Sequence, residues 1–269
     1  MKVGNLATRV LTAAVLAPLL VLAINWHNPI ALWAIVFAAT LVALAEYFAM
    51  TLDDPIERRM GTVLGAAIAL ALFFWPHGFA VAFPATIVLP ALFFLFRFGE
   101  LSTVVTRLGT MSFGVVYAGV LPTYLSLCKS EGGAHGAGWV YLVLMTAWFS
   151  DTGAYFAGRL LGKKKLYPAI SPGKTWAGAL GGLGGAFLGA VLANLWFFPE
   201  LGWGHGAALT LLGGVLGQCG DLVESMIKRA RSVKDSGNLL PGHGGMLDRI
   251  DAVLFIAPWV YLYRALIWQ

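Results

Sequence analysis

Long apolar runs recur along the whole chain, and short polar segments separate them. A hydrophobic run of roughly 18 residues or more is long enough for a helix to cross the hydrocarbon core of a bilayer. The pattern therefore predicts an all-α, polytopic integral membrane protein with about nine transmembrane helices. The predicted spans are about 10–26, 29–50, 61–76, 78–96, 109–127, 138–157, 176–199, 203–220 and 250–267.

The composition agrees with this class of protein. Of the 269 residues, 59% are hydrophobic and 12% are charged, and the mean hydropathy is +0.78. A soluble domain is nearer a quarter charged, so a soluble enzyme is excluded and no nucleic-acid partner is expected. Lys2 and Arg9 precede the first run, but no small-residue cleavage site follows and another apolar run comes at once. We therefore expect a retained helix rather than a signal peptide.

The basic residues are unevenly distributed between the polar segments. If the N-terminus is cytoplasmic, nine spans place the N-terminal segment and four loops on the inside, and these hold sixteen of the eighteen Lys and Arg residues. This asymmetry predicts a multi-pass protein of the inner (cytoplasmic) membrane. Topology and attraction to anionic lipid headgroups account for most of these charges. The four inner loops are 51–60, 97–108, 158–175 and 221–249.

The polar segment from Asp221 to Asp251 holds five of the thirteen acidic residues. Asp221 and Glu224 stand three residues apart at the inner end of one predicted span, and Asp248 and Asp251 three apart at the start of the next. Residues at i and i+3 share a helix face. Four carboxylates at one membrane level repel one another unless cations intervene, and hard oxygen ligands suit Mg²⁺. The alternative is a set of helix-end charges, paired with Arg229, Arg231 or Arg249.

Basic residues and a glycine-rich turn complete this segment. Lys228, Arg229, Arg231 and Lys234 follow the first acidic pair and are suited to neutralising a triphosphate or pyrophosphate. His243 lies among Gly242, Gly244 and Gly245, and such a turn lets backbone N–H groups approach phosphate oxygens. His243 is equally compatible with a phosphate donor and with a plain loop residue.

A second polar cluster runs from Asp151 to Thr175. Asp151 lies inside an apolar run, where a carboxylate is a functional candidate by default and a structural hydrogen bond is the alternative. Ser171 and Lys174 precede Thr175, which is placed to cap a following helix whose N-terminus attracts anions. This arrangement predicts a phosphate site, although the leading glycine of a Walker A loop is absent.

Two further features predict packing. Gly181, Gly185 and Gly189 form a GxxxGxxxG face, which allows close approach of another helix of the same chain or of a partner. Glu46 lies near the inner end of the second span, where we expect snorkelling or pairing with Arg58.

Both polar clusters resemble the CDP-diacylglycerol synthases, also called phosphatidate cytidylyltransferases. Residues 225–251 match the pattern SxxKRxxxxKDxxxxxPGHGGxxDRxD, and residues 151–175 resemble DTGAYFxGRxxGKxKLxPxISPxKT. The chain departs from the family pattern SPxKTxEG at Ala177, where a glutamate is usual. The chain is then a single membrane domain, with N-terminal helices in 1–130 and a catalytic region in 131–269.

The resemblance implies transfer of the cytidylyl group of CTP to phosphatidic acid at the cytoplasmic face, in phospholipid biosynthesis. Asp221 and Asp248 are the expected ligands of Mg²⁺, with a second cation also compatible, and Asp251 and Asp151 are second choices. A homodimer is a reasonable expectation for the family. The expected phosphate-binding and substrate-binding residues are Lys228, Arg229, Lys234, Asp235, Ser171, Lys174, Thr175, His243 and Gly244.

Two other functions compete with this one. A CTP-dependent lipid kinase acting on a polyprenol or similar alcohol would use the same metal and triphosphate chemistry. An ion-coupled transporter would use Asp151 and the inner carboxylates as an ion path. The clustering of the acids at one membrane face and the lack of a visible repeat argue against a transporter.

Overall fold

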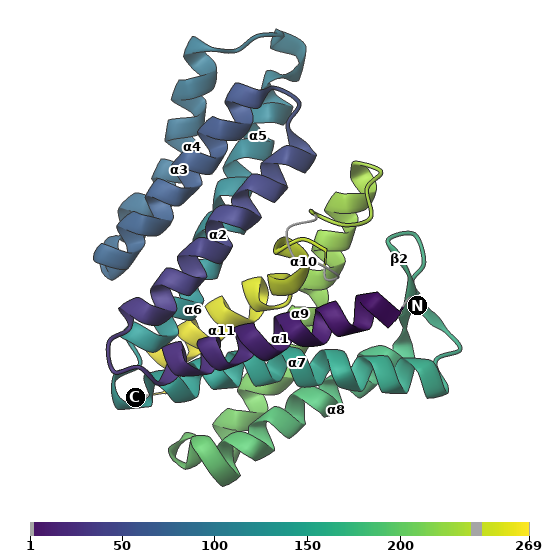
Figure 1. Ribbon diagram of the computed structural model, residues 1–269. Coiled ribbons are helices and arrows are strands. Elements are labelled where there is room, and N and C mark those ends of the chain that lie inside the picture. Colours follow the sequence, from purple (N-terminus) through teal and green to yellow (C-terminus); the bar gives the residue numbers. More distant parts are fainter. Residues whose placement is uncertain (1–2, 238–243, 269) are drawn as a thin grey trace. The chain divides into compact units, whose positions relative to one another are not determined.

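The computed structural model describes residues 3–237 and 244–268, and most of them are helical (Figure 1). Each of the nine predicted spans coincides with a helical segment. The helices are α1 (Val3–Asn25), α2 (Ile30–Thr51), α3 (Pro55–Phe74), α4 (Phe79–Phe96), α5 (Val104–Gly114), α6 (Leu121–Ser130), α7 (Gly136–Leu161), α8 (Trp176–Leu192), α9 (Trp203–Ala230), α10 (Leu247–Ile250) and α11 (Val253–Leu266).

Several helices have the length and apolar composition of membrane spans. Five segments in the described part of the chain meet both criteria, and two shorter apolar helices accompany them. The prediction of a polytopic, nearly all-α membrane protein is therefore confirmed, whereas the count of nine crossings stays a prediction. The five segments are Ile30–Thr51, Pro76–Phe96, Leu101–Ser130, Trp176–Phe197 and Trp203–Ala230, and the shorter helices are Ala14–Asn25 and Val253–Leu266.

The two long polar segments differ from the loops expected at 158–175 and 221–249. Helix α7 continues to Leu161, and an antiparallel hairpin of β1 (Lys165–Tyr167) and β2 (Ser171–Thr175) follows it. Helix α9 continues through the charged stretch to Ala230. Polar side chains do not end a helix once it leaves the apolar layer, because its backbone hydrogen bonds are internal. The predicted loop starts were therefore too early.

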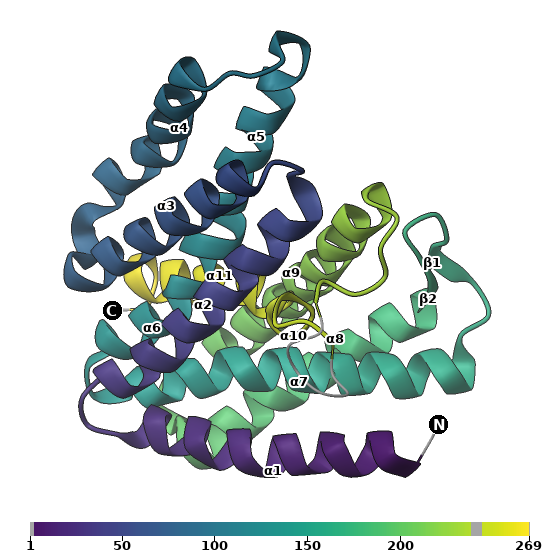
Figure 2. The same ribbon diagram turned by 45° about the horizontal axis from the view of Figure 1, so that its top comes forward.

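The chain divides into two compact units. The first contains residues 1–126 together with 235–249, and the second contains 127–234 and 250–269. In the first unit, α2 packs against α3, and α3 and α5 flank α4 (Figure 2). The π-helical turn η3 (Val115–Val120) joins α5 to α6, and a Cβ on its Gly119 would lie 3.2 Å from the Cα of Gly65. Glycine thus allows η3 to approach α3 closely.

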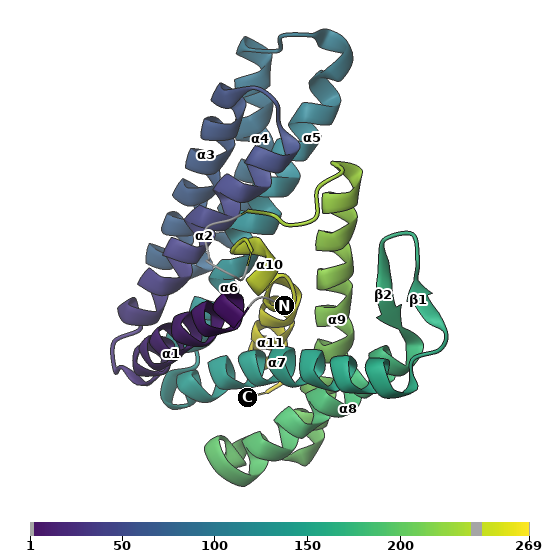
Figure 3. The ribbon, with the colours of Figure 1, turned by 45° about the vertical axis from the view of Figure 1, so that its right-hand side comes forward.

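In the second unit, α7 packs along α8, and α9 packs against α7, α8 and α11 (Figure 3). Glycines make the α7–α8 contact possible: a Cβ on Gly185 would lie 2.0 Å from the carbonyl oxygen of Phe149, and one on Gly181 would lie 2.2 Å from the Cβ of Ala157. The partner of the GxxxGxxxG face is therefore α7 of the same chain.

Candidate active site

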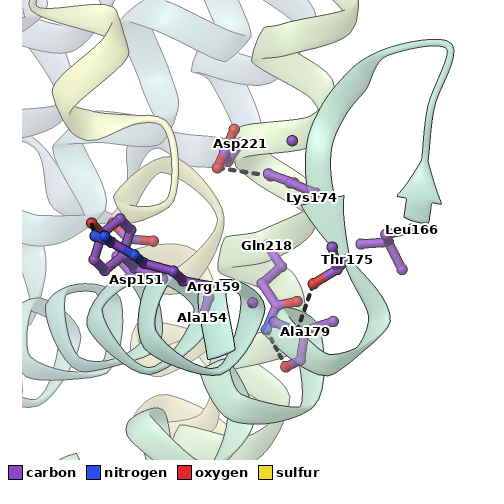
Figure 4. A pocket seen from close by; sticks show the side chains of 13 residues that line it. Asp151, Ala154, Arg159, Leu166, Lys174, Thr175, Ala179, Gln218 and Asp221 are labelled. Atoms are coloured by element: carbon purple, nitrogen blue, oxygen red, sulfur yellow. Dashed lines mark hydrogen bonds and ion pairs between the residues drawn. The ribbon is translucent and has the colours of Figure 1, made fainter. Parts of the chain in front are cut away.

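A cavity of about 410 Å³ lies in the second unit, where α7, the hairpin, the start of α8 and α9 meet (Figure 4). Four of the residues singled out from the sequence line it: Asp151 from α7, Lys174 and Thr175 from the end of β2, and Asp221 from α9. Residues 70 positions apart in the chain thus share one cavity, and its walls carry both charged and apolar side chains.

An ion pair between Lys174 and Asp221 spans the cavity. The Lys174 Nζ lies 2.7 Å from Asp221 Oδ2, and Figure 4 shows the two side chains pointing toward each other. Their side chains remain 24% and 34% exposed, respectively. The Lys174 Nζ atom itself is buried, so a ligand can separate the pair only if it offers the ammonium group a counter-charge in place of Asp221.

The N-terminus of α8 opens beside this pair. Thr175 is the N-cap, and its Oγ1 accepts a hydrogen bond of 3.1 Å from the backbone N–H of Gly178. Trp176 N–H donates to the carbonyl of Lys164, which fixes the hairpin to the helix start. The peptide dipoles at the start of α8 favour the binding of an anion. Lys174 adds a positive charge immediately before the helix. The predicted capping role of Thr175 is confirmed.

Three carboxylates of the second unit lie close enough to influence one another. Asp251 lies in the turn before α11, where the charges of Asp221, Asp151 and Lys174 all act on it. Three acids thus lie within electrostatic range of one lysine. A cation bound near Asp221 would relieve this repulsion, so the residues present fit a divalent cation.

The described residues hold no group of three or more His, Cys, Asp or Glu side chains close enough to enclose a metal ion. Mg²⁺ does not require such a group, since it is usually held by one or two carboxylates, with waters and substrate phosphates completing its shell. The carboxylates of the cavity are therefore compatible with Mg²⁺ whose remaining ligands are water or substrate oxygens.

The other predicted basic residues of the second unit contact protein groups. Lys228 is nearly buried and lies 2.5 Å from Glu224 one helical turn earlier. Arg229 donates to the carbonyls of Ile170 and Val233 and so ties α9 to the hairpin. Lys234 is exposed, and Ser171 lies in β2. None of these four side chains lines the cavity.

The remaining predicted residues, 235–249, belong to the first unit. There Asp248 Oδ2 accepts hydrogen bonds from the backbone N–H groups of Ser236 (3.0 Å) and Gly245 (2.9 Å). Gly244 has a φ of 82°, which a side chain would strain. Asp235 is exposed, and His243 lies outside the described residues. Pairing of Asp221 with Asp248 at one cation stays a prediction.

Asp248 and Asp251 do not lie in one continuous helix as expected. Asp248 lies in the four-residue helix α10, whereas Asp251 lies in the turn that separates α10 from α11. The i, i+3 rule applies only within a continuous helix. The spacing alone therefore does not establish these two acids as a pair, and their grouping stays a prediction.

Three cavity residues with polar side chains were missed by the sequence interpretation: Tyr155, Arg159 and Gln218. Arg159 Nη1 lies 2.9 Å from the hydroxyl of Tyr155, and Gln218 donates to the carbonyl of Ala179. Tyr155 and Arg159 follow Asp151 at intervals of four residues. Helical spacing could therefore have identified Asp151, Tyr155 and Arg159 as one face of α7. Gln218 gave no such signal, because its bond joins α9 to α8.

Comparisons with known proteins all point to one family, the cytidylyltransferases. The sequence pattern of the cytidylyltransferase family matches residues 7–267. Proteins named phosphatidate cytidylyltransferase are similar to this chain. One from Synechocystis sp. (strain ATCC 27184 / PCC 6803 / Kazusa) is 33% identical over 295 residues, covering 99% of this chain and 98% of the relative.

Two other relatives of the same name match more closely over a shorter stretch. The protein of Bacillus subtilis (strain 168) is 40% identical over 60% of this chain, and that of Brucella suis biovar 1 (strain 1330) is 42% identical over 57%. These matches cover 59% and 56% of the relatives' own lengths.

Proposed function

The chain belongs to the cytidylyltransferase family, and on that premise we propose that it transfers the cytidylyl group of CTP to phosphatidic acid. The products are CDP-diacylglycerol and pyrophosphate. The observation that carries the proposal is the cavity in which the Lys174–Asp221 pair faces the N-terminus of α8. This combination supplies a cation, a helix-start dipole and a carboxylate at one place, and a nucleoside triphosphate with its divalent cation needs all three.

The reaction is an in-line displacement at the α-phosphorus of CTP. A phosphate oxygen of phosphatidic acid forms the new P–O bond, and the bond from the α-phosphorus to the oxygen that bridges it to the β-phosphorus breaks. The attacking phosphate is already an anion, so no strong general base is required. The protein must align two anions and offset their repulsion.

Lys174 and the N-terminus of α8 perform this task for the phosphate oxygens that enter the cavity. When phosphate oxygens enter the cavity, the Lys174 ammonium exchanges Asp221 for a phosphate oxygen at the start of α8. Thr175 keeps that helix start open and in place through its bond to Gly178. Arg159 and Tyr155 lie on the same cavity wall as Asp151, where an arginine is suited to bind the second phosphate-bearing substrate.

Asp221, released from Lys174, is the residue of the cavity best placed to hold Mg²⁺, with Asp248 as the second ligand implied by the family pattern. The bound cation supplies positive charge to the triphosphate. Asp151 and Asp251 keep the region negative, which favours retention of that cation. Lys228, Arg229 and Lys234 then act on phosphates only indirectly or after rearrangement, because Lys228 and Arg229 contact other groups of the protein.

The lipid substrate fits a multi-pass membrane protein. We place the cavity and the N-terminus on the cytoplasmic side of the inner membrane, because the basic residues concentrate in the segments predicted to lie there. A homodimer stays an expectation from the family, and the GxxxGxxxG face does not support it, since that face packs within the chain.

The test supplies the purified protein with phosphatidic acid, Mg²⁺ and either CTP or ATP, and follows the lipid product and pyrophosphate. We expect CDP-diacylglycerol with CTP, loss of turnover after chelation of Mg²⁺, and a decrease of at least about 100-fold in kcat for Asp221→Asn. Glu200→Gln is the matched control, because Glu200 is exposed and, within the described part of the chain, its one ion pair is with His135.

Two outcomes would contradict the proposal. Release of a nucleoside diphosphate together with a phosphorylated lipid alcohol would establish a lipid kinase. Equal activities of Asp221→Asn and Glu200→Gln would show that the cavity takes no part in the reaction.

A further inference from the structure

Glu46 of α2 is bound to a segment that lies about 190 to 200 residues later in the chain. Its Oε1 accepts a hydrogen bond of 2.9 Å from the backbone N–H of Met246. Its Oε2 accepts one of 2.9 Å from the N–H of Leu247, and the Ser236 hydroxyl lies 3.1 Å from the same oxygen. The side chain is buried, so these donors replace the water that a carboxylate otherwise needs.

The same segment holds Asp248. Its Oδ2 accepts from the backbone N–H groups of Ser236 and Gly245, and it lies 3.0 Å from the Ser236 hydroxyl. That hydroxyl therefore lies between the carboxylates of Glu46 and Asp248, and its single proton can serve only one of them at a time. The positions of the two carboxylates are coupled through Ser236.

Glycines enclose Glu46 so closely that its placement determines the path of the segment. A Cβ on Gly237 would lie 2.4 Å from Glu46 Oε1, and one on Gly245 would lie 2.6 Å from Oε2 and 2.0 Å from the Ser236 hydroxyl oxygen. Only glycine leaves room for a carboxylate at this distance from the backbone. Gly237 and Gly245 are thus both close neighbours of the Glu46 carboxylate, and a larger residue at either position would displace it.

We propose that Glu46 is a positioning residue: it fixes the segment Gly244–Asp248 and thereby sets the orientation of the Asp248 carboxylate as a cation ligand. The inference rests on the proposed function, because Asp248 owes its assignment as a cation ligand to the family pattern. It replaces the expected snorkelling of Glu46 or its pairing with Arg58, whose Nε donates instead to the carbonyl of Leu52. Residues that orient metal ligands typically contribute about 10- to 100-fold to metal affinity or activity.

The substitution Glu46→Gln isolates this role. Glutamine keeps the size of the side chain but has one acceptor oxygen in place of two, and its NH₂ group would face an N–H donor of Met246 or Leu247. A buried donor would then lack an acceptor, and the segment would open more often. Glu57→Gln is the matched control, because Glu57 is another buried glutamate of the first unit and pairs with Arg107.

Two measurements that need no turnover test the proposal. The first is hydrogen–deuterium exchange of the metal-free protein, in which Glu46→Gln should speed exchange in the peptide containing Met246 and Leu247 by about tenfold or more, with little change in Glu57→Gln. The second is the rise in melting temperature on Mg²⁺ titration in the presence of CTP. We expect the half-saturating Mg²⁺ concentration to rise about 10- to 100-fold for Glu46→Gln only.

Unchanged exchange in Glu46→Gln would overturn the proposed anchoring. Faster exchange with an unchanged Mg²⁺ requirement would also overturn the proposal, since Glu46 would then be structural only. Both measurements remain decisive if the wild-type protein forms no CDP-diacylglycerol, in which case only the proposed function fails.

Discussion

At the scale of single residues, the ion pair between Lys174 and Asp221 combines two properties that a purely structural pair does not need. It lines a cavity, and both side chains remain partly exposed. The pair holds the Lys174 ammonium group, whose nitrogen is buried, and the Asp221 carboxylate at the cavity, where a phosphate and a cation could replace them as partners. The ion pair therefore matters chiefly for the ligands that Lys174 and Asp221 bind when the pair separates.

Replacement of Lys174 by methionine should lower kcat/KM for CTP by roughly 10- to 100-fold, because a charged hydrogen bond to phosphate contributes about 1.5–3 kcal/mol. Lys163→Met is the control: Lys163 belongs to the same polar segment, is exposed and does not line the cavity. Steady-state kinetics with CTP varied at saturating phosphatidic acid measures both. Equal losses in the two variants would mean that only the overall positive charge of the hairpin region matters.

At the scale of elements, the α7–α8 contact positions two sides of the cavity. Asp151 lies on α7, and Thr175 and Lys174 lie at the start of α8. Because the two helices touch through backbone at Gly153, Gly181 and Gly185, their separation is set by glycine rather than by adaptable side chains. Close backbone packing of this kind holds helices together where lipid offers no hydrophobic driving force.

Gly185→Ala should lower the melting temperature of the purified protein, because its Cβ would meet the carbonyl oxygen of Phe149 at 2.0 Å and overpacking costs about 1–3 kcal/mol. Gly184→Ala supplies the control from the adjacent position, where a Cβ meets no atom within 4 Å. There the higher helix propensity of alanine should leave stability unchanged or raise it by up to about 1 kcal/mol. A similar response of both variants would show that the α7–α8 contact is not tight in the protein.

The helices were largely predictable from the sequence, and their ends were not. Each apolar run had to become a helix, because backbone groups in lipid can satisfy one another only within a helix or a closed barrel. The extension of α9 to Ala230 and the hairpin at Lys165–Thr175 lie outside that constraint. Local sequence gives no strong signal for a strand that is three residues long and contains a lysine.

The candidate site was predictable in part for a similar reason. Lys174, Thr175 and Asp221 were identified by residue type and by position at helix ends, and they do share a cavity. Glu46 was misinterpreted because its partners are backbone groups of Met246 and Leu247. Backbone donors occur at every position, so no sequence pattern marks those that a distant carboxylate will use.

At the scale of the whole molecule, the proposed chemistry requires the hairpin to face the compartment that contains CTP. The three lysines at 163–165 and the exposed position of Lys164 agree with a cytoplasmic hairpin. Glu200 lies between α8 and α9, which the nine-span topology places on the opposite side of the membrane.

A cysteine at position 164 should therefore react with a membrane-impermeant thiol reagent only from the cytoplasmic side. The experiment uses Lys164→Cys in a Cys219→Ser background, where the buried Cys128 is the remaining thiol. Inverted and right-side-out vesicles are labelled in parallel, with Glu200→Cys as the control that should react from the other side. Labelling of both positions from one side would contradict the nine-span topology.

The bonds from Glu46 to Ser236, Met246 and Leu247 also bear on how the protein is made. Helix α2 leaves the ribosome long before residues 236–247 are synthesised, so the Glu46 carboxylate must remain hydrated or borrow another donor during that interval. Closing so long a loop carries an entropic cost that shorter contacts avoid. Completion of the first unit thus belongs to the end of biosynthesis, because Glu46 meets its native donors only after Met246 and Leu247 have been added.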